Sequence, residues 1–459
     1  MGVKLLKAGF ANFTIFEKAD GVGGTWHDNT YPDCGCDVPS MLYSYSFEQY
    51  PEWDRMWAKQ SQILKYIEHV VEKYGLAKHI QLNTMVKKAV WNNDANKWEV
   101  YLQKHNKIES KVISDYVVMA NGTLHVPIFP DIPGISSRDG KSIFRGESFH
   151  AAKWNHKYSY KNKRVGVIGT GASAIQLVPE VAKDAEQVFV FQRTPSWVFY
   201  KTDFAFPGWC KFLFRTCPLL MRLFRSIIYL STEIRFGGLY QQSLLNWWMY
   251  HDALSYIQQS IPDPTLRKKV TPSYVMGCKR MLFSSLWYPA LCRDNVHVIT
   301  DRISSITECG VAIHTEELGA SSEPDKQEVE ATREVELDLI VYATGFSITR
   351  EDIPEEYAFD IIGRNSASLN EWMIKGPRTL LGITAVNFPN LFILYGPNTN
   401  LGHNSIIFMM ECQVNYIIQL LLRHQRRGAG PCIEVREGAV EAFQAECVQT
   451  GLRGKVANC

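Results

Sequence analysis

The sequence predicts an α/β protein with two interleaved Rossmann-like domains and a helical insert. Three observations support this fold class. A buried strand at residues 164–168 runs into a glycine-rich turn and then a helical pattern. A short apolar strand at residues 12–16 ends at an acidic residue, Glu17. Two further apolar strands, at 116–120 and 337–342, both run towards a glycine, which indicates that the chain crosses between the domains twice.

Length and composition are those of a globular protein with large cores. The chain has 459 residues, 46% of them hydrophobic and 21% charged, which excludes a disordered or fibrous protein. Lys plus Arg is 49 and Asp plus Glu is 47, so the formal net charge is +2 and no overall basic field attracts nucleic acid. The eleven cysteines lack metal-ligand spacing and follow no secretory signal. We therefore expect reduced thiols, no metal site and a cytoplasmic protein.

Periodicity predicts the remaining elements. Residues 61–74 place apolar side chains on one helical face, and residues 404–423 form a longer helical pattern. Residues 86–91 and 98–102 flank a polar turn and predict a hairpin. Three prolines and a glycine at 126–134 have linker composition. The expected organisation is a first domain in two parts, 1–135 and 346–459, around a second domain at 136–345 with an insert at about 200–270.

The glycine-rich turn is the strongest local signal for a ligand. In a strand–turn–helix context, two glycines permit a tight turn and a close approach of the backbone to a pyrophosphate. The next strand, 188–192, leads into Arg193 and Thr194 instead of an acidic residue, and an arginine suits the 2′-phosphate of NADP. The second domain is therefore predicted to bind NADPH; a chance glycine turn and a surface arginine are the alternatives. The turn consists of Gly169, Thr170, Gly171, Ala172 and Ser173.

The N-terminal residues look like the middle of another dinucleotide-binding unit. The strand at 12–16 matches the second strand of such a unit, and Glu17 stands where an acid binds the ribose. The first strand and its glycine loop are expected before residue 1, so the first domain is predicted to lack them in this chain.

The most apolar region is the insert between residues 209 and 248. Charged residues interrupt it, and no uncharged run reaches the roughly 18–20 residues of a membrane-spanning helix. Buried or half-buried helices are one interpretation. The other interpretation is an exposed apolar lid, or a surface in peripheral contact with a membrane, that admits an apolar substrate.

Two further patterns carry a resemblance to a known family. Gly23, Gly24 and Trp26 precede a Tyr31-Pro32 pair and Asp37. The second pattern lies just ahead of the glycine-rich turn and consists of an aromatic residue, a glycine, a histidine and a tryptophan at set spacings. In these patterns the sequence resembles the Baeyer–Villiger monooxygenases, which are class B, flavin-containing monooxygenase-like flavoproteins; Asp33 and Asn155 depart from the two patterns. The residues of the second pattern are Phe144, Gly146, His150 and Trp154.

The resemblance implies a two-cofactor oxidation. In the family NADPH reduces a bound FAD, O₂ is activated at the flavin, and one oxygen atom is inserted next to a ketone carbonyl to give an ester or lactone. It implies that Arg280 stabilises the negative oxygen species and that Asp37 orients Arg280. Lys279 would help to hold the NADP phosphate, and His150 has a supporting role. Further cofactor-binding roles are implied for Glu17, Gly24, Thr25, Trp26, Tyr43 and Asn398.

Several alternatives stay open at this stage. The family usually has a glycine-rich FAD loop before residue 1 and continues past Cys459, so the chain is expected to be a version shortened at both ends. A monooxygenase that oxygenates nitrogen or sulfur, or a non-catalytic NADP-binding remnant, would share many of these motifs. The aromatic insert favours a bulky apolar ketone as substrate, and by analogy a place in secondary metabolism.

Overall fold

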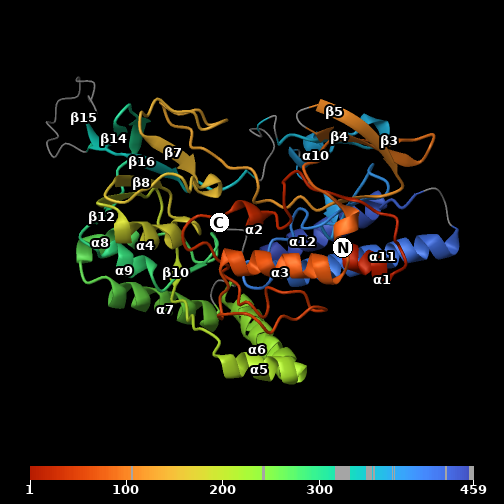
Figure 1. Ribbon diagram of the computed structural model, residues 1–459, viewed down its shortest axis with the longest axis horizontal. Helices are drawn as coiled ribbons and strands as arrows, with labels where there is room; N and C mark the ends of the chain where they lie inside the picture. Colours follow the sequence, from red (N-terminus) through yellow and green to blue (C-terminus); the bar gives the residue numbers. More distant parts are fainter. Residues whose placement is uncertain are drawn as a thin grey trace.

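The computed structural model describes residues 1–104, 107–239, 243–315, 331–347, 354, 357–374, 376, 378–428 and 432–453. It confirms the α/β class, with one set of sheets on each side of the molecule and helices beneath them (Figure 1).

A five-stranded parallel sheet forms the centre of the half that holds the glycine-rich turn. Its strand order is β12-β9-β8-β16-β7. The strands are β7 (Glu147–His150), β8 (Arg164–Ile168), β9 (Gln187–Phe191), β12 (Val296–Ile299) and β16 (Leu339–Tyr342). The central strands are apolar on both faces because helices α4 (Ala174–Asp184) and α9 (Trp287–Leu291) cover one side. The other side packs on an antiparallel sheet of β13 (Ile303–Ile306), β14 (Gly310–Thr315) and β15 (Ala331–Glu336).

The other half contains two separate pairs of parallel strands. The first pair is β1 (Ile15–Phe16) with β2 (Ile80–Gln81), and the second is β6 (Val117–Met119) with β20 (Leu391–Ile393). An outer sheet has the order β17-β3-β4-β5, and its β3–β4 hairpin confirms the predicted one. Its strands are β3 (Met85–Asn92), β4 (Lys97–Lys104), β5 (Lys107–Ser114) and β17 (Asp360–Ile362).

Long helices support these strands. Both predicted helices form, as α3 (Gln60–Lys73) and α11 (Ile406–Arg427), and the short α1 (Gly2–Lys7) contacts α11. Helix α12 (Glu437–Arg453) follows near the C-terminus. Among the described residues, α11 is long and apolar enough by composition to cross a membrane. One face of α11 packs in a core through Val414, Ile417 and Leu421.

The insert is helical, as predicted. Helices α5 (Gly208–Thr216) and α6 (Pro218–Phe236) form a hairpin that projects at the lower edge of Figure 1. Helices α7 (Leu244–Ser260) and α8 (Pro264–Val270) return beneath the five-stranded sheet. The chain then pairs β11 (Leu282–Phe283) with β10 (Val198–Phe199), so the insert begins and ends at the same place.

Candidate active site

A carboxylate and a guanidinium from distant segments meet between the two halves. One Arg280 nitrogen donates to both Asp37 oxygens, at 2.6 and 2.5 Å. The Asp37 side chain is 17% exposed and the Arg280 side chain 56% exposed, so the acid is held inside while the cation faces outward. The Asp37 carboxylate raises the pKa of Arg280, and Arg280 therefore stays charged at any working pH.

A tyrosine and a lysine that sequence analysis did not single out lie close to this pair. Tyr395 follows β20 and adds to the electrostatic environment of Arg280. The Lys201 ammonium donates to the Cys36 carbonyl at 3.3 Å and lies 5.0 Å from the centre of the Trp57 ring. Burial lowers the pKa of Lys201. No sequence motif predicts these contacts, because they join segments that lie far apart in the chain.

Gln176 ties the Asp37 loop to the other half of the molecule. It lies in the first turns of α4, and its amide exchanges hydrogen bonds with Gly35: the Gly35 N–H donates at 3.0 Å, and the Gln176 side chain donates back at 3.1 Å. The Tyr31 hydroxyl donates to the same side-chain oxygen at 3.2 Å. The loop that carries Asp37 is thus fixed against the helix that follows the glycine-rich turn.

The Gly-Gly-x-Trp segment packs beside Asp37. Gly23 and Gly24 have φ values of +126° and +52°, and Gly24 precedes the single turn of α2 (Thr25–Asp28). The Trp26 indole donates to the Tyr43 hydroxyl at 3.0 Å. Burial raises the pKa of Tyr43 strongly, so this hydroxyl is neutral. Thr25 starts α2, and its carbonyl accepts from Asn29 at 2.9 Å.

The glycine-rich turn has the predicted strand–turn–helix geometry. Gly169 follows β8 with φ +112°, and a Cβ there would lie 2.5 Å from the Ala343 carbonyl oxygen. Gly171 has open space around it, and Ala172 and Ser173 lead into α4. The Thr170 hydroxyl donates to the Thr194 carbonyl at 3.1 Å, which fixes the turn next to the exposed Arg193 after β9.

The second pattern forms a packed corner beside the sheet. A Cβ on Gly146 would lie 2.5 Å from the buried Phe144 ring. His150 is 2% exposed, accepts from the Ala152 N–H at 3.1 Å, and has its pKa lowered by burial to about 4. The Trp154 ring meets Phe149 edge to face at 5.0 Å. A neutral, enclosed histidine fits the predicted supporting role.

Other predicted residues lie apart from the Asp37–Arg280 pair in the described contacts. The Glu17 carboxylate, at the end of β1, accepts from the Ala19 N–H at 2.9 Å. Asn398 is exposed with φ +62° in the turn after Tyr395. Lys279 is exposed and lies 4.9 Å from the centre of the Tyr274 ring. Nine of the ten described cysteines are free.

The two residues that depart from the patterns have clear local roles. Asp33 adopts φ +63°, a conformation that Asp tolerates better than most residues, and it forms an ion pair with Lys59. The Asn155 amide donates to Glu147 at 2.8 Å.

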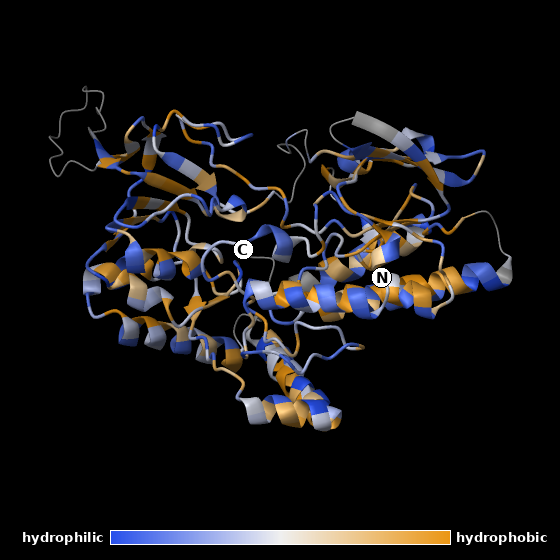
Figure 2. Cartoon of the chain, viewed as in Figure 1, coloured by the Kyte–Doolittle hydropathy of each residue, from blue (hydrophilic) through white to orange (hydrophobic). Residues whose placement is uncertain are grey.

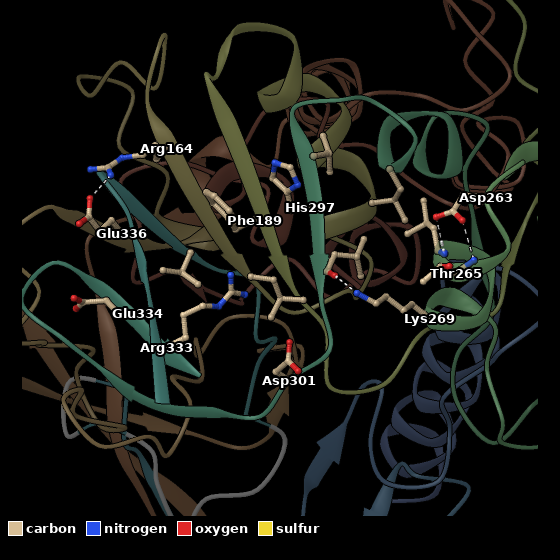
Figure 3. A pocket seen from close by; sticks show the side chains of 16 residues that line it. Arg164, Phe189, Asp263, Thr265, Lys269, His297, Asp301, Arg333, Glu334 and Glu336 are labelled. Atoms are coloured by element: carbon tan, nitrogen blue, oxygen red, sulfur yellow. Dashed lines mark hydrogen bonds and ion pairs between the residues drawn. The ribbon is translucent and has the colours of Figure 1, made fainter. Parts of the chain in front are cut away.

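A hollow in the described structure contains none of these groups. It has a volume of about 710 Å³ and lies at the outer edge of the five-stranded sheet, between β12, β15 and α8 (Figure 3). Several of its charged groups already serve the fold: Arg164 pairs with Glu336 at 2.6 Å, Asp263 caps α8, and Lys269 donates to the Val298 carbonyl at 3.2 Å. We therefore take Asp37 and Arg280, and not this hollow, as the candidate site.

Comparison with known proteins gives consistent matches. Residues 7–270 match the family model described as flavin-binding monooxygenase-like. A Baeyer–Villiger monooxygenase of Pseudomonas aeruginosa is 39% identical over 93% of this chain and 75% of its own length. An open crystal structure of cyclohexanone monooxygenase is 26% identical, with a TM-score of 0.81 over 98% of this chain and 90% of that one. The structure of OTEMO in complex with FAD and NADP has a TM-score of 0.79 at 26% identity, over 97% of this chain and 86% of that one.

Proposed function

Because this chain belongs to the flavin-binding monooxygenase-like family and is a Baeyer–Villiger monooxygenase, we propose that it inserts one oxygen atom of O₂ into a bulky apolar ketone. The product is an ester or a lactone, and the cofactors are FAD and NADPH. A cytoplasmic location is part of the same proposal.

The Asp37–Arg280 pair is the observation that carries this proposal. The reaction passes through negatively charged oxygen, which a fixed positive charge stabilises. Arg280 supplies a charge that does not depend on pH, and the two bonds from Asp37 fix where it stands. Gln176 and Lys201 in turn hold the backbone on either side of Cys36.

The residues of the glycine-rich turn fit an NADP phosphate group. The close packing of Gly169 on Ala343 brings the turn against the sheet, and the open space at Gly171 leaves its backbone accessible. Arg193 stands exposed at the end of the neighbouring strand and has no ion-pair partner among the described residues. These residues would hold the pyrophosphate at the start of α4 and the 2′-phosphate at Arg193.

The residues of the other half fit two parts of FAD. Glu17 at the end of β1 would bind a ribose hydroxyl. The Gly23–Gly24 turn is crowded at Gly23, where a Cβ would lie 2.6 Å from Leu64, and it leads to Trp26, Tyr43 and Asp37, which would help to hold the FAD. When bound, the flavin supplies oxygen activation and NADPH supplies the hydride.

Product analysis tests the proposal. The purified chain, supplied with FAD, NADPH, ¹⁸O₂ and a panel of bulky ketones, is expected to give esters or lactones carrying one ¹⁸O atom by mass spectrometry. Arg280→Met should lower this yield by roughly 100- to 1,000-fold, as loss of a charge-stabilising donor does in other enzymes. Arg293→Met, which changes an exposed arginine outside the site, should leave the yield unchanged.

The same assay can contradict the proposal. Formation of a sulfoxide or N-oxide, with no ester from any ketone, would identify a nitrogen- or sulfur-oxygenating enzyme. Full ester yield from Arg280→Met would remove Arg280 from the chemistry.

A further inference from the structure

Helix α6 carries an apolar stripe on its outer face. Leu219, Leu223, Ile227, Leu230 and Ile234 follow one another at intervals of three or four residues, so their side chains share one face. Each of them is 55–72% exposed. The opposite face of α6 is buried in a core through Met221 and Ile228. Apolar residues therefore cover both faces of α6, although packing within the protein requires only one.

The neighbouring helices expose further large apolar side chains. Helix α5 exposes Trp209 and Phe212, and the start of α7 exposes Trp247 and Trp248, each to between 57 and 65%. Helix α5 contacts α6, and the short turn Gly237–Leu239 contacts both α6 and α7. Figure 2 shows the hydrophobic colour along the projecting α5–α6 hairpin. We call the exposed apolar residues of α5, α6 and α7 the hairpin face.

The charge of the hairpin is one-sided. Between Asp203 and Glu233 the sequence contains two lysine or arginine residues in each helix, Lys211 and Arg215 in α5 and Arg222 and Arg225 in α6, and no acidic residue. The whole chain has a net charge of only +2. Arg222 is exposed beside the stripe. Such a combination of exposed tryptophan, phenylalanine and leucine with cations is typical of helices that lie in the interface of an anionic membrane.

The hairpin is held firmly by its other cations. Arg225 donates to the Met41 and Ser44 carbonyls at 2.5 and 3.1 Å. Arg215 pairs with Glu52 at 2.6 Å through its Nη2, and Lys211 pairs with Asp54 at 2.5 Å. The apolar stripe is therefore presented by a fixed element and not by a loose segment.

We propose that the hairpin face docks on the surface of a bilayer that contains anionic lipid, with α5, α6 and the start of α7 lying in the headgroup region. A second copy of the chain fits less well, because residues 204–232 contain no acidic residue that could pair with the exposed Arg222 of the other copy in a two-fold contact. A bulky apolar ketone partitions into the same bilayer, so docking would concentrate the substrate near the enzyme. That last consequence rests on the proposed function, whereas the docking itself does not.

Vesicle flotation without substrate tests the docking. Wild-type protein should float with vesicles of phosphatidylcholine containing 30% phosphatidylglycerol, and more weakly with phosphatidylcholine alone. Leu223→Glu and Ile227→Glu should each weaken binding at least tenfold, because they place a negative charge in the apolar stripe. Arg222→Gln should weaken binding to the anionic vesicles by roughly fivefold, as expected for one surface charge, and more so at low salt.

Ile113→Glu is the matched control, because Ile113 is a comparably exposed residue (50%) on β5, away from the hairpin. It should float like the wild type, and circular dichroism should show the same fold for all variants. Wild-type protein that stays unbound with both vesicle types would overturn the proposal. A dimer in solution that Leu223→Glu dissociates, without vesicle binding, would assign the face to a second copy instead. Because no ketone is present, these outcomes are independent of the proposed reaction.

Discussion

At the scale of single residues, the contact between Arg280 and Asp37 gives each side chain a defined position that its residue type alone does not imply. Either side chain alone would be an ordinary surface or loop charge. Two hydrogen bonds from one guanidinium nitrogen to a largely buried carboxylate fix a permanent positive charge at a defined point. The site therefore has a preorganised cation without a titrating group, which suits chemistry on anionic oxygen.

Arg193 is expected to decide between the two nicotinamide cofactors. It is exposed after β9, where an acidic residue would favour NADH. Arg193→Ala should raise the KM for NADPH by roughly tenfold or more while leaving the KM for NADH unchanged, since only NADPH has the 2′-phosphate. Steady-state kinetics with both cofactors measures this. An equal rise for both would show that Arg193 does not contact the 2′-phosphate.

His150 is expected to make stability depend on pH. Its pKa is about 4 in the folded protein, because burial disfavours the charged ring, against about 6.5 in the unfolded chain. Between pH 6.5 and about pH 4, His150 binds a proton in the unfolded chain but not in the folded protein. The free energy of unfolding therefore falls as the pH falls through this range. This linkage is worth about 2 kcal/mol at pH 5.

Denaturant unfolding at pH 7 and pH 5 measures this effect. In His150→Asn, which keeps an acceptor for the Ala152 N–H, the loss between these pH values should shrink by that amount. An unchanged loss would place the pH sensitivity elsewhere.

At the scale of elements, α4 has two tasks. Its start follows the glycine-rich turn, and Gln176 on the same helix holds the loop of Asp37. One helix thus links the nucleotide turn of one half to the charged pair beside the other half. A displacement of α4 would move both.

Gln176→Met is expected to separate these tasks. Methionine has a similar length but leaves the Gly35 N–H and carbonyl without partners, which should cost about 1–3 kcal/mol of stability. The ester yield should fall as Asp37 loosens, while NADPH binding stays unchanged. Gln259→Met is the control, because Gln259 makes only an exposed bond to Ser255 on α7. Unaltered yield and stability would show that the Gly35 contacts do not position Asp37.

At the scale of the whole molecule, the proposed function assigns the two nucleotides to separate halves. NADP would bind along one continuous sheet, and FAD would bind beside β1 and its neighbours. Each cofactor would bind the folded state only. At one hundred times its Kd, each should therefore stabilise the folded protein by about 2.7 kcal/mol and raise its melting temperature independently of the other.

Gly169→Ala distinguishes the two effects. The added Cβ would lie 2.5 Å from the Ala343 oxygen at a φ of +112°, so the turn must shift. The melting-temperature rise with NADP⁺ should disappear, and the rise with FAD should remain. Gly438→Ala on α12, where a Cβ meets no atom within 4 Å, should keep both. Loss of both rises in Gly169→Ala would mean that the substitution disturbs the whole fold.

Local sequence signals predicted the elements that depend on near neighbours. Sequence patterns predicted three such elements: the strand 164–168, the turn at Gly169 and the hairpin of β3 and β4. This was possible because periodicity, glycines and polar turns act within a few residues. The insert was predicted as helical, but which of its faces lies in solvent was not. Burial depends on what packs opposite, and a helix that is apolar on both sides gives no preference.

The sequence by itself determined which functional residues the protein has: a glycine-rich turn followed by a strand that leads into an arginine, and the charged residues Asp37 and Arg280. The resemblance implied that Asp37 orients Arg280, and the structure has these two residues in contact. Only the tertiary structure added Gln176, Lys201 and Tyr395 around them and left the stripe of α6 in solvent. The physical reason is that hydrogen bonds and burial act over a few ångströms in space, whatever the distance along the chain.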